Sequence, residues 1–218
     1  MIAQALHSAV DNLESVWLDI ARRWHAQRIA GRSDYAFTEH YAAPHTDRWL
    51  EHLSHLKDRE NVRFLEVGSF EGRSAIWFLE NVLTHPTATI TCIDPFRRAG
   101  SEALFDHNVR VSNQGSRLVK TKGRSEVVMP GLEPGSYDAI YIDGSHVALN
   151  VLMDAAAGWR LLKPGGIMIF DDYRWSLEKP PTERPEMAID LFLETVDSTL
   201  TLLHKDSQVI VRKNLLTR

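Results

Sequence analysis

The chain has 218 residues, enough for one domain with a sizeable buried core. Its formal net charge is −4 with both signs interspersed, so it lacks the clustered basic face that nucleic-acid binding requires. The single cysteine, Cys92, excludes an intrachain disulfide, and the lack of a signal-like start or of a run of about 18 apolar residues predicts a cytoplasmic protein without a membrane span.

Residues 1–58 are predicted to form a helical extension or lid. Apolar side chains recur at helical spacing over residues 2–30, and Gly31 marks the expected end of this helix. Because one such helix is not stable alone in water, we expect it to pack on the domain that follows or on a second copy of the chain. A second helix is predicted from about Pro44 to Lys57.

Residues 59–218 are predicted to form one α/β domain in which strands and helices alternate. The strands are expected at 62–67, 88–93, 117–121, 137–142 and 166–171, and the helices at 72–84, 101–112, 125–130 and 146–162. Short links between them favour a parallel sheet with right-handed crossovers and helices on both faces.

The C-terminal part departs from this alternation. After a helix at about 185–197, two apolar runs at 200–204 and 208–212 are separated only by Lys205-Asp206-Ser207, which predicts an antiparallel hairpin at the sheet edge. The expected fold is therefore a Rossmann-like, doubly wound, seven-stranded sheet with an antiparallel C-terminal strand.

A glycine loop follows the first of these strands. Gly68 and Gly72 lie four residues apart, between the strand and a helix, so backbone can approach a ligand closely and the helix N-terminus faces it. Asp94 lies 22 residues after Gly72, at the tip of the second strand, where an acid accepts hydrogen bonds from ribose hydroxyls. The pattern predicts a nucleoside site, with ordinary turn glycines and a turn aspartate as the alternative.

Three features narrow the choice of nucleoside. Phe70 stands where a dinucleotide-binding loop has its second glycine, and its ring fills the space that a pyrophosphate needs. The chain also lacks the lysine-containing loop that binds nucleoside triphosphates. Glu66 would repel phosphate but suits an ammonium group. S-adenosylmethionine carries a ribose, a carboxylate, an ammonium and a sulfonium without phosphate, so the loop fits it best.

Four motifs in chain order resemble those of the class I S-adenosylmethionine-dependent methyltransferases: Glu66-Val67-Gly68-Ser69-Phe70-Glu71-Gly72-Arg73-Ser74, Ile93-Asp94-Pro95, Asp143-Gly144-Ser145-His146 and Leu161-Leu162-Lys163-Pro164-Gly165-Gly166-Ile167-Met168-Ile169-Phe170-Asp171-Asp172. Over about residues 60–213 the chain is most similar to small O-methyltransferases of the catechol type and to macrolide and aminocoumarin sugar methyltransferases. The resemblance implies methyl transfer to a hydroxyl of a small molecule. It implies cofactor contacts from Glu66, Gly68, Ser69, Gly72, Ser74, Asp94, Pro95, Arg124, Ser125 and Asp143. For Ser74 and Ser125, helix capping is the alternative.

Acids also end the fourth and fifth strands. Asp143, Asp171 and Asp172 are expected to converge there, since neighbouring strands lie about 4.8 Å apart. Convergent carboxylates repel one another unless they are protonated, hydrogen-bonded or neutralised by a cation, and their oxygens suit Mg²⁺ or Ca²⁺. Solvated turn acids are the alternative. The resemblance implies Mg²⁺ at Asp, Asp and Asn, and Asp172 departs from that set as it does in the sugar methyltransferases.

His146 follows Asp143 by three residues, at the expected start of a helix. A neutral imidazole can accept a hydroxyl proton near neutral pH, so His146 is the candidate general base, with Asp143 beside it. The resemblance implies this role as well, because its catechol branch has a lysine there and its sugar branch a histidine. A helix-capping histidine is the alternative, and the other nine of the ten histidines are expected at the surface.

Two other functional classes remain open. One is a methyltransferase-like module that binds the cofactor without turnover, and the other is a nicotinamide-dependent oxidoreductase, which Phe70 disfavours. The expected partners are a small-molecule acceptor, either a sugar or an aromatic compound, and a second copy of the chain through the N-terminal helix. Four aromatic side chains in two loops either roof the acceptor site or anchor their loops: Tyr35, Phe37, Tyr173 and Trp175.

Overall fold

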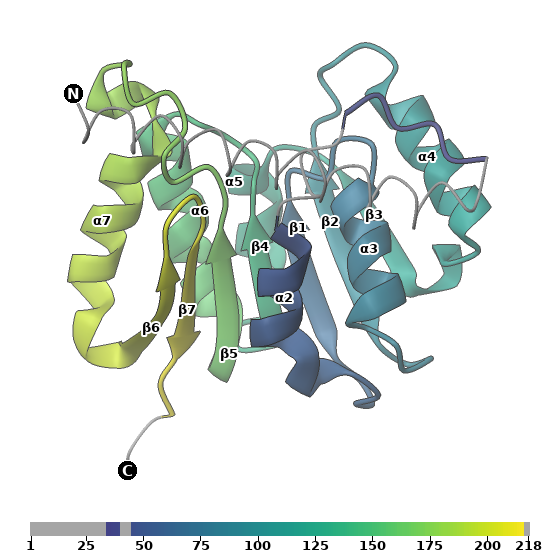
Figure 1. The fold of residues 1–218 in the computed structure, drawn as a ribbon, viewed down its shortest axis with the longest axis horizontal. Helices are drawn as coiled ribbons and strands as arrows, with labels where there is room; N and C mark the ends of the chain where they lie inside the picture. Colours follow the sequence, from purple (N-terminus) through teal and green to yellow (C-terminus); the bar gives the residue numbers. More distant parts are fainter. Residues whose placement is uncertain (1–33, 40–44, 216–218) are drawn as a thin grey trace, which may run out of the picture.

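The computed structural model describes residues 34–39 and 45–215. Within these ranges seven strands form one sheet of order β3-β2-β1-β4-β5-β7-β6 (Figure 1). The strands are β1 (Arg63–Val67), β2 (Thr89–Asp94), β3 (Leu118–Lys122), β4 (Tyr137–Ile142), β5 (Leu162–Phe170), β6 (Leu200–Lys205) and β7 (Val209–Lys213).

Helices cover both faces of the sheet (Figure 1). The α-helices are α2 (Thr46–Leu53), α3 (Arg73–Asn81), α4 (Ser101–Ser112), α5 (Ser125–Val128), α6 (Ala148–Leu161) and α7 (Pro185–Val196). Helices α2, α3 and α4 supply Trp49, Phe78 and Phe105 to one hydrophobic core, and α6 and α7 supply Val151 and Phe192 to the other.

The strand directions confirm the predicted fold. Strands β1 to β5 pair in parallel, while β7 runs antiparallel to both β5 and β6. The predicted hairpin is present, with β7 inserted beside β5 and β6 at the sheet edge. The strand order reverses between β1 and β4, and in such sheets ligands bind beyond the carboxyl ends of the strands at this position.

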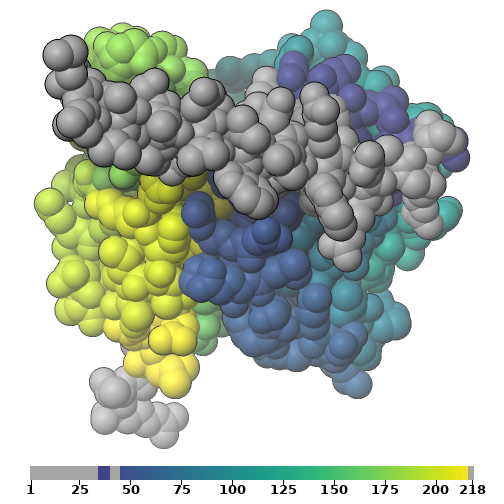
Figure 2. Space-filling view, viewed as in Figure 1, coloured from purple at the N-terminus to yellow at the C-terminus, as the bar shows by residue number. Residues whose placement is uncertain are grey.

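The N-terminal part of the described chain packs beside its C-terminal hairpin. Trp49 of α2 is fully buried, and its indole N–H donates a hydrogen bond of 3.0 Å to the side chain of Gln208, just before β7. Figure 2 shows the two segments side by side as blue and yellow surfaces. Helix α2 therefore packs in the same hydrophobic core as the sheet. It precedes residue 58, where the boundary between the two predicted domains lies. That boundary stays a prediction.

Several predicted element boundaries are wrong. Helix α6 begins at Ala148, so His146 lies in the loop after β4 rather than in a helix. Strand β5 begins at Leu162, because Leu162 pairs with Tyr137 before Ile167 pairs with Ala139, and the Pro-Gly-Gly turn is an irregularity inside the strand. The predicted helix over residues 2–30 and the predicted start at Pro44 fall outside the described residues. No helix in the described ranges is long and apolar enough to cross a membrane.

Candidate functional site

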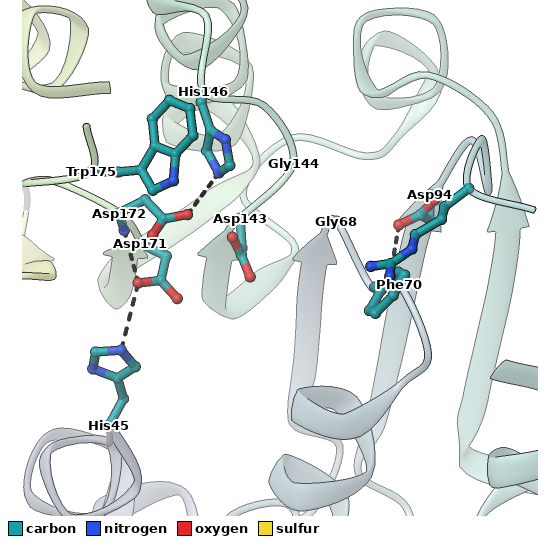
Figure 3. Close-up of a pocket in the computed structure, with 11 residues that line it drawn as sticks. His45, Gly68, Phe70, Asp94, Asp143, Gly144, His146, Asp171, Asp172 and Trp175 are labelled. Carbon is teal, nitrogen blue, oxygen red and sulfur yellow. Dashed lines mark hydrogen bonds and ion pairs between the residues drawn. The ribbon is translucent and has the colours of Figure 1, made fainter. Parts of the chain in front are cut away.

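A cavity of about 710 Å³ opens at the carboxyl ends of β1, β4 and β5 (Figure 3). Its wall comes from segments far apart in the sequence: His45, Gly68, Phe70, Asp94, Arg98, Asp143, Gly144, His146, Asp171, Asp172 and Trp175. The chain therefore brings the glycine loop, the second-strand acid and the acids of β4 and β5 to one site, as the expected topology requires.

Gly68 shapes the floor of this cavity. Its φ of +89° is in the region that only glycine adopts without strain, and an added Cβ would lie 2.0 Å from the carbonyl oxygen of Asp143. The backbone N–H of Asp143 donates to the carbonyl of Val67 at 2.8 Å, which joins the tips of β1 and β4. Gly72, with φ +81°, is the N-cap residue of α3, so Ser74 is not the cap.

Asp94 holds the glycine loop in place. Its two carboxylate oxygens accept hydrogen bonds from the backbone N–H groups of Phe70, at 2.8 Å, and Phe96, at 2.5 Å. Asp94 therefore does form the local turn hydrogen bonds that were the alternative interpretation of this residue. Each carboxylate oxygen has a further lone pair, and Asp94 lines the cavity. The carboxylate can therefore still accept hydrogen bonds from ribose hydroxyls.

A second cavity of about 280 Å³ adjoins the first beyond Asp94. Five predicted cofactor residues line it together: Gly68, Asp94, Pro95, Arg124 and Ser125. Arg124 is the N-cap residue of α5, and no side-chain capping bond is present there, so capping does not explain Ser125. Asp154 of α6 reaches the same cavity, and burial raises the pKa of its carboxyl to about 6. This side chain was not predicted.

Glu66 lies beneath the glycine loop. Its side chain is fully buried, and burial raises its pKa to about 7, an effect that the hydroxyls of Ser69 and Ser74 offset only in part. Glu66 does not line any of the cavities described here, whereas Ser69 and Ser74 line a narrower one beside the loop. We therefore expect Glu66 to hold the glycine loop in position from beneath it.

The pKa of Glu66 predicts a pH dependence of stability. Folding raises the pKa of this carboxyl from 4.5 to about 7, so the folded state holds a proton that the unfolded state has lost in this window. The free energy of unfolding should fall as pH rises from about 4.5 to 7, by about 3 kcal/mol from this group. In urea denaturation, Glu66→Gln should show a correspondingly smaller difference between pH 4.5 and pH 8.

Glu60→Gln is the matched control, because Glu60 is exposed just before β1. It should keep the wild-type pH profile, since an exposed carboxyl is solvated in both states. A Glu66→Gln variant with the wild-type profile would contradict a buried, protonated Glu66.

An acid–histidine cluster stands at the tips of β4 and β5 (Figure 3). Asp143, His146 and Asp172 each offer a potential ligand atom, and these atoms all lie within 4.8 Å of one another. Asp171, the remaining predicted ligand, is turned elsewhere. Its oxygens accept hydrogen bonds from the hydroxyl of Tyr141 and from the backbone N–H of Asp172, and Oδ1 lies 3.9 Å from Nε2 of His45.

The carboxylates of this cluster repel one another. Burial and the charges of Asp171, Asp172 and Glu66 raise the pKa of Asp143 well above its usual value. Burial also raises the pKa of Asp171, a shift that His45 opposes. Carboxylates that repel one another in this way are stabilised by protonation, by hydrogen bonds or by a bound cation, and their oxygens are the ligands that Mg²⁺ prefers. The residues present therefore fit a divalent cation.

His146 is paired with Asp172 rather than capping a helix. Its Nε2 lies 2.7 Å from Oδ2 of Asp172, and its ring stacks on Trp175 with centroids 4.1 Å apart. The carboxylate favours the tautomer with the proton on Nε2, which leaves Nδ1 as the proton acceptor. Stacking and hydrogen bonding together fix the plane of the ring.

Three residues in or beside the cavity were not predicted. His45 was expected at the surface with the other histidines, but it is largely buried and burial lowers its pKa. Among the described residues, its Nδ1 has no hydrogen-bond partner. Tyr141 donates to Asp171, and its hydroxyl lies 3.3 Å from Oδ2 of Asp143. Arg98 lies over the ring of Phe70 and pairs with Glu39 at 3.5 Å.

The four loop aromatics have different roles. Trp175 lines the cavity. Tyr173 is buried and donates a hydrogen bond of 3.0 Å to Asp190, which anchors its loop. Tyr35 stacks on Phe37 at 5.2 Å, and Phe37 lies under the guanidinium of Arg73. Of the four, only Trp175 lies where it could contact an acceptor.

Comparison with known proteins places this site in context. A family model described as a methyltransferase domain matches residues 65–173 of the 218, which is half of the chain. That range holds the glycine loop, Asp94, Asp143, His146 and both acids after β5.

Two curated relatives match part of the chain. An uncharacterised protein, R132, of Acanthamoeba polyphaga mimivirus is 30% identical over 140 residues, which is 61% of this chain and 62% of the relative. A protein of Mycobacteroides abscessus named as a candidate O-methyltransferase is 30% identical over 106 residues, 48% of this chain and 46% of the relative. The match thus spans about half to three fifths of the length of these relatives.

Solved structures share the fold. The O-methyltransferase TomG of Streptomyces achromogenes, in complex with S-adenosylmethionine, has a TM-score of 0.61 at 17% identity, over 90% of this chain and 89% of that one. An O-methyltransferase of Bacillus cereus in complex with S-adenosylhomocysteine has a TM-score of 0.63 at 13% identity, over 87% and 89%.

Proposed function

The chain belongs to the class I S-adenosylmethionine-dependent methyltransferases, and we propose on this basis that it methylates a hydroxyl group of a small molecule. The observation that carries the proposal is the cluster of Asp143, His146 and Asp172 next to the glycine loop. A base and acids at this edge serve proton removal from an acceptor, for which a protein that only binds the cofactor has no use.

We assign the methyl donor to the loop between β1 and α3 and to the two cavities beside it. S-adenosylmethionine supplies an electrophilic methyl group on a sulfonium. Asp94 would accept hydrogen bonds from its ribose hydroxyls, and Pro95, Arg124 and Ser125 would surround its adenine. The close contact of Gly68 with Asp143 supports this arrangement, because it packs the loop backbone against the tip of β4 and so holds Gly68 in the wall of both cavities.

His146 would remove the proton from the acceptor. As the oxygen attacks the methyl group in line, the C–S bond breaks, the C–O bond forms and the hydroxyl proton passes to the imidazole. Asp172 orients this ring and stabilises the imidazolium that results, because its carboxylate already lies 2.7 Å from Nε2.

A divalent cation, Mg²⁺ by donor chemistry, is proposed between Asp143 and Asp172. When bound, such an ion lowers the pKa of an acceptor hydroxyl and fixes its position. Asp171 could join Asp143 and Asp172 as the third predicted metal ligand only by giving up its contacts with Tyr141 and His45. In its present position it tethers Tyr141, whose hydroxyl also faces Asp143.

The acceptor side of the main cavity combines carboxylates with the exposed edge of Trp175. Such a lining suits a neutral polyhydroxy compound, a sugar or a phenol, and disfavours an anionic acceptor because the carboxylates would repel it. Trp175 contributes its edge to this lining, since its ring already stacks on His146 and lies under the ammonium of Lys179.

A label-transfer screen tests this function. The protein is incubated with methyl-labelled S-adenosylmethionine, Mg²⁺ and pools of sugars, phenols and other hydroxylated metabolites. We expect label to enter one or more acceptors as a methyl ether, which resists alkaline hydrolysis. Tight binding of S-adenosylhomocysteine without any transfer would instead support a silent cofactor-binding module.

A further inference from the structure

Two imidazoles lie on opposite sides of the acid pair at the tip of β5, and the proposed reaction uses only one of them (Figure 3). His146 lies beside Asp172, whereas His45, the residue before α2, lies beside Asp171. Both His45 and Asp171 line the main cavity. The second imidazole therefore borders the space assigned to the acceptor without a role in proton removal.

Helix α2 does not use the side chain of His45. This residue is the N-cap of the helix, yet its side chain makes no capping hydrogen bond. Only 15% of the side chain is exposed, and among the described residues its buried Nδ1 has no hydrogen-bond partner. Its ring lies 6.1 Å from that of Trp49, which is itself fixed by Gln208. A polar side chain that is held at a cavity wall in this way indicates a role toward a ligand.

His45 and Asp171 frame a gap of the size that a hydroxyl group fills. Nε2 of His45 lies 3.9 Å from Oδ1 of Asp171, which is too long for a direct hydrogen bond. Both atoms can instead form hydrogen bonds of about 2.9 Å to one oxygen that contacts them both. The carboxylate favours the tautomer with the proton on Nε2, so the imidazole donates. Oδ1 accepts one hydrogen bond already and has a second lone pair for the proton of the hydroxyl.

The carboxylate of this pair is fixed on the sheet. Tyr141 of β4 donates a hydrogen bond to Oδ2 of Asp171, and the backbone N–H of Asp172 donates to Oδ1 at 2.8 Å. Only 12% of the Asp171 side chain is exposed. Because these contacts hold Asp171 apart from the cation proposed between Asp143 and Asp172, its carboxylate is available for hydrogen bonding to a ligand.

We propose that His45 and Asp171 bind a second hydroxyl of the acceptor, while the first hydroxyl receives the methyl group next to His146. This assignment rests on the proposed function, because it needs a hydroxylated acceptor in the main cavity. The N–H of His45 donates to the oxygen of the second hydroxyl, and that hydroxyl donates to Oδ1 of Asp171. A monohydroxy compound leaves both protein groups desolvated without a partner, so the site rejects it. The substrate class is thereby narrowed to compounds with at least two free hydroxyls.

Phenol and its three dihydroxy counterparts test this assignment: catechol, resorcinol and hydroquinone. Label transfer from S-adenosylmethionine is measured as kcat/KM for each compound with wild-type protein, His45→Leu and His45→Gln. We expect at least one dihydroxy isomer to exceed phenol by about 10- to 100-fold in the wild type. His45→Leu should abolish this preference by lowering the dihydroxy rate alone. His45→Gln keeps an N–H donor and should restore part of the preference.

His55→Leu is the matched control, because His55 is an exposed histidine that lines none of the three cavities at the site. It should keep the wild-type preference. Equal loss of activity toward phenol and the dihydroxy isomers in His45→Leu would assign His45 to the shape of the site and overturn the proposal. A preference for catechol alone that survives in His45→Leu would also overturn it, because two neighbouring hydroxyls on one cation would then account for the preference.

The label-transfer screen extends the test to other acceptors. If the acceptor is a sugar, that sugar and its deoxy counterparts take the place of the phenols, and an acceptor with a single hydroxyl would overturn the proposal. If His45→Leu does not fold, His45→Phe takes its place, and a wild type without preference for a second hydroxyl overturns the proposal in either case. A wild-type protein that transfers label to no acceptor would contradict the proposed function itself.

Discussion

Replacing His146 with alanine should slow methyl transfer by about 10²- to 10⁴-fold while the affinity for S-adenosylhomocysteine stays close to that of the wild type. The imidazole is held by Asp172 at 2.7 Å and by stacking on Trp175, so it is positioned for proton transfer rather than for contact with the nucleoside. Turnover is measured with an acceptor from the label-transfer screen, and affinity by calorimetry.

Two further measurements make this prediction specific. Added imidazole should restore part of the activity of His146→Ala, because the cavity left by the side chain is at the rim of an open site. His55→Ala, at an exposed histidine after α2, should behave as wild type. A His146→Ala enzyme with wild-type turnover would remove the base from the mechanism.

Replacing Asp143 with asparagine should lower activity at limiting Mg²⁺ by about 10²- to 10³-fold, because several kcal/mol of metal assistance is lost. Excess Mg²⁺ should recover part of it, since the ligand site is weakened while the base remains. The same change should raise the melting temperature of the metal-free protein. It removes a carboxyl whose pKa is raised by burial and by the charges of Asp171 and Asp172.

Asp106→Asn is the control, at an exposed carboxylate of α4 that pairs with Lys120. It should change neither metal dependence nor the rate. Full wild-type activity in excess chelator would contradict metal assistance. An Asp143→Asn protein that binds Mg²⁺ as tightly as the wild type would remove Asp143 from the proposed ligands.

The fold could be predicted almost completely from the sequence, since its strands are short apolar runs followed by glycine or acid. The strand β4 and the helix α4 begin and end at the predicted residues. The start of β5 could not be predicted, because Leu162 joins the sheet through Tyr137, a partner 25 residues away, although a Pro-Gly-Gly turn follows it. The turn residues indicate a later start of the strand, but the pairing of Leu162 with Tyr137 determines where it begins.

The backbone positions of the site were also predictable, because parallel strands end at one edge of the sheet. The orientations of the side chains were not. Asp171 contacts Tyr141 and His45 and not His146. His45 lies 126 residues before Asp171 in the chain, and no local pattern marks it.

The central claim is that the glycine loop and Asp94 bind S-adenosylmethionine, and one calorimetric titration tests it most directly. Wild-type protein and Asp94→Ala are titrated in parallel with S-adenosylhomocysteine and with NAD⁺. We predict a one-to-one complex of the wild type with S-adenosylhomocysteine, weakening by about 10- to 100-fold in Asp94→Ala, and no binding of NAD⁺ to either protein. Binding of NAD⁺ without binding of S-adenosylhomocysteine would contradict the account.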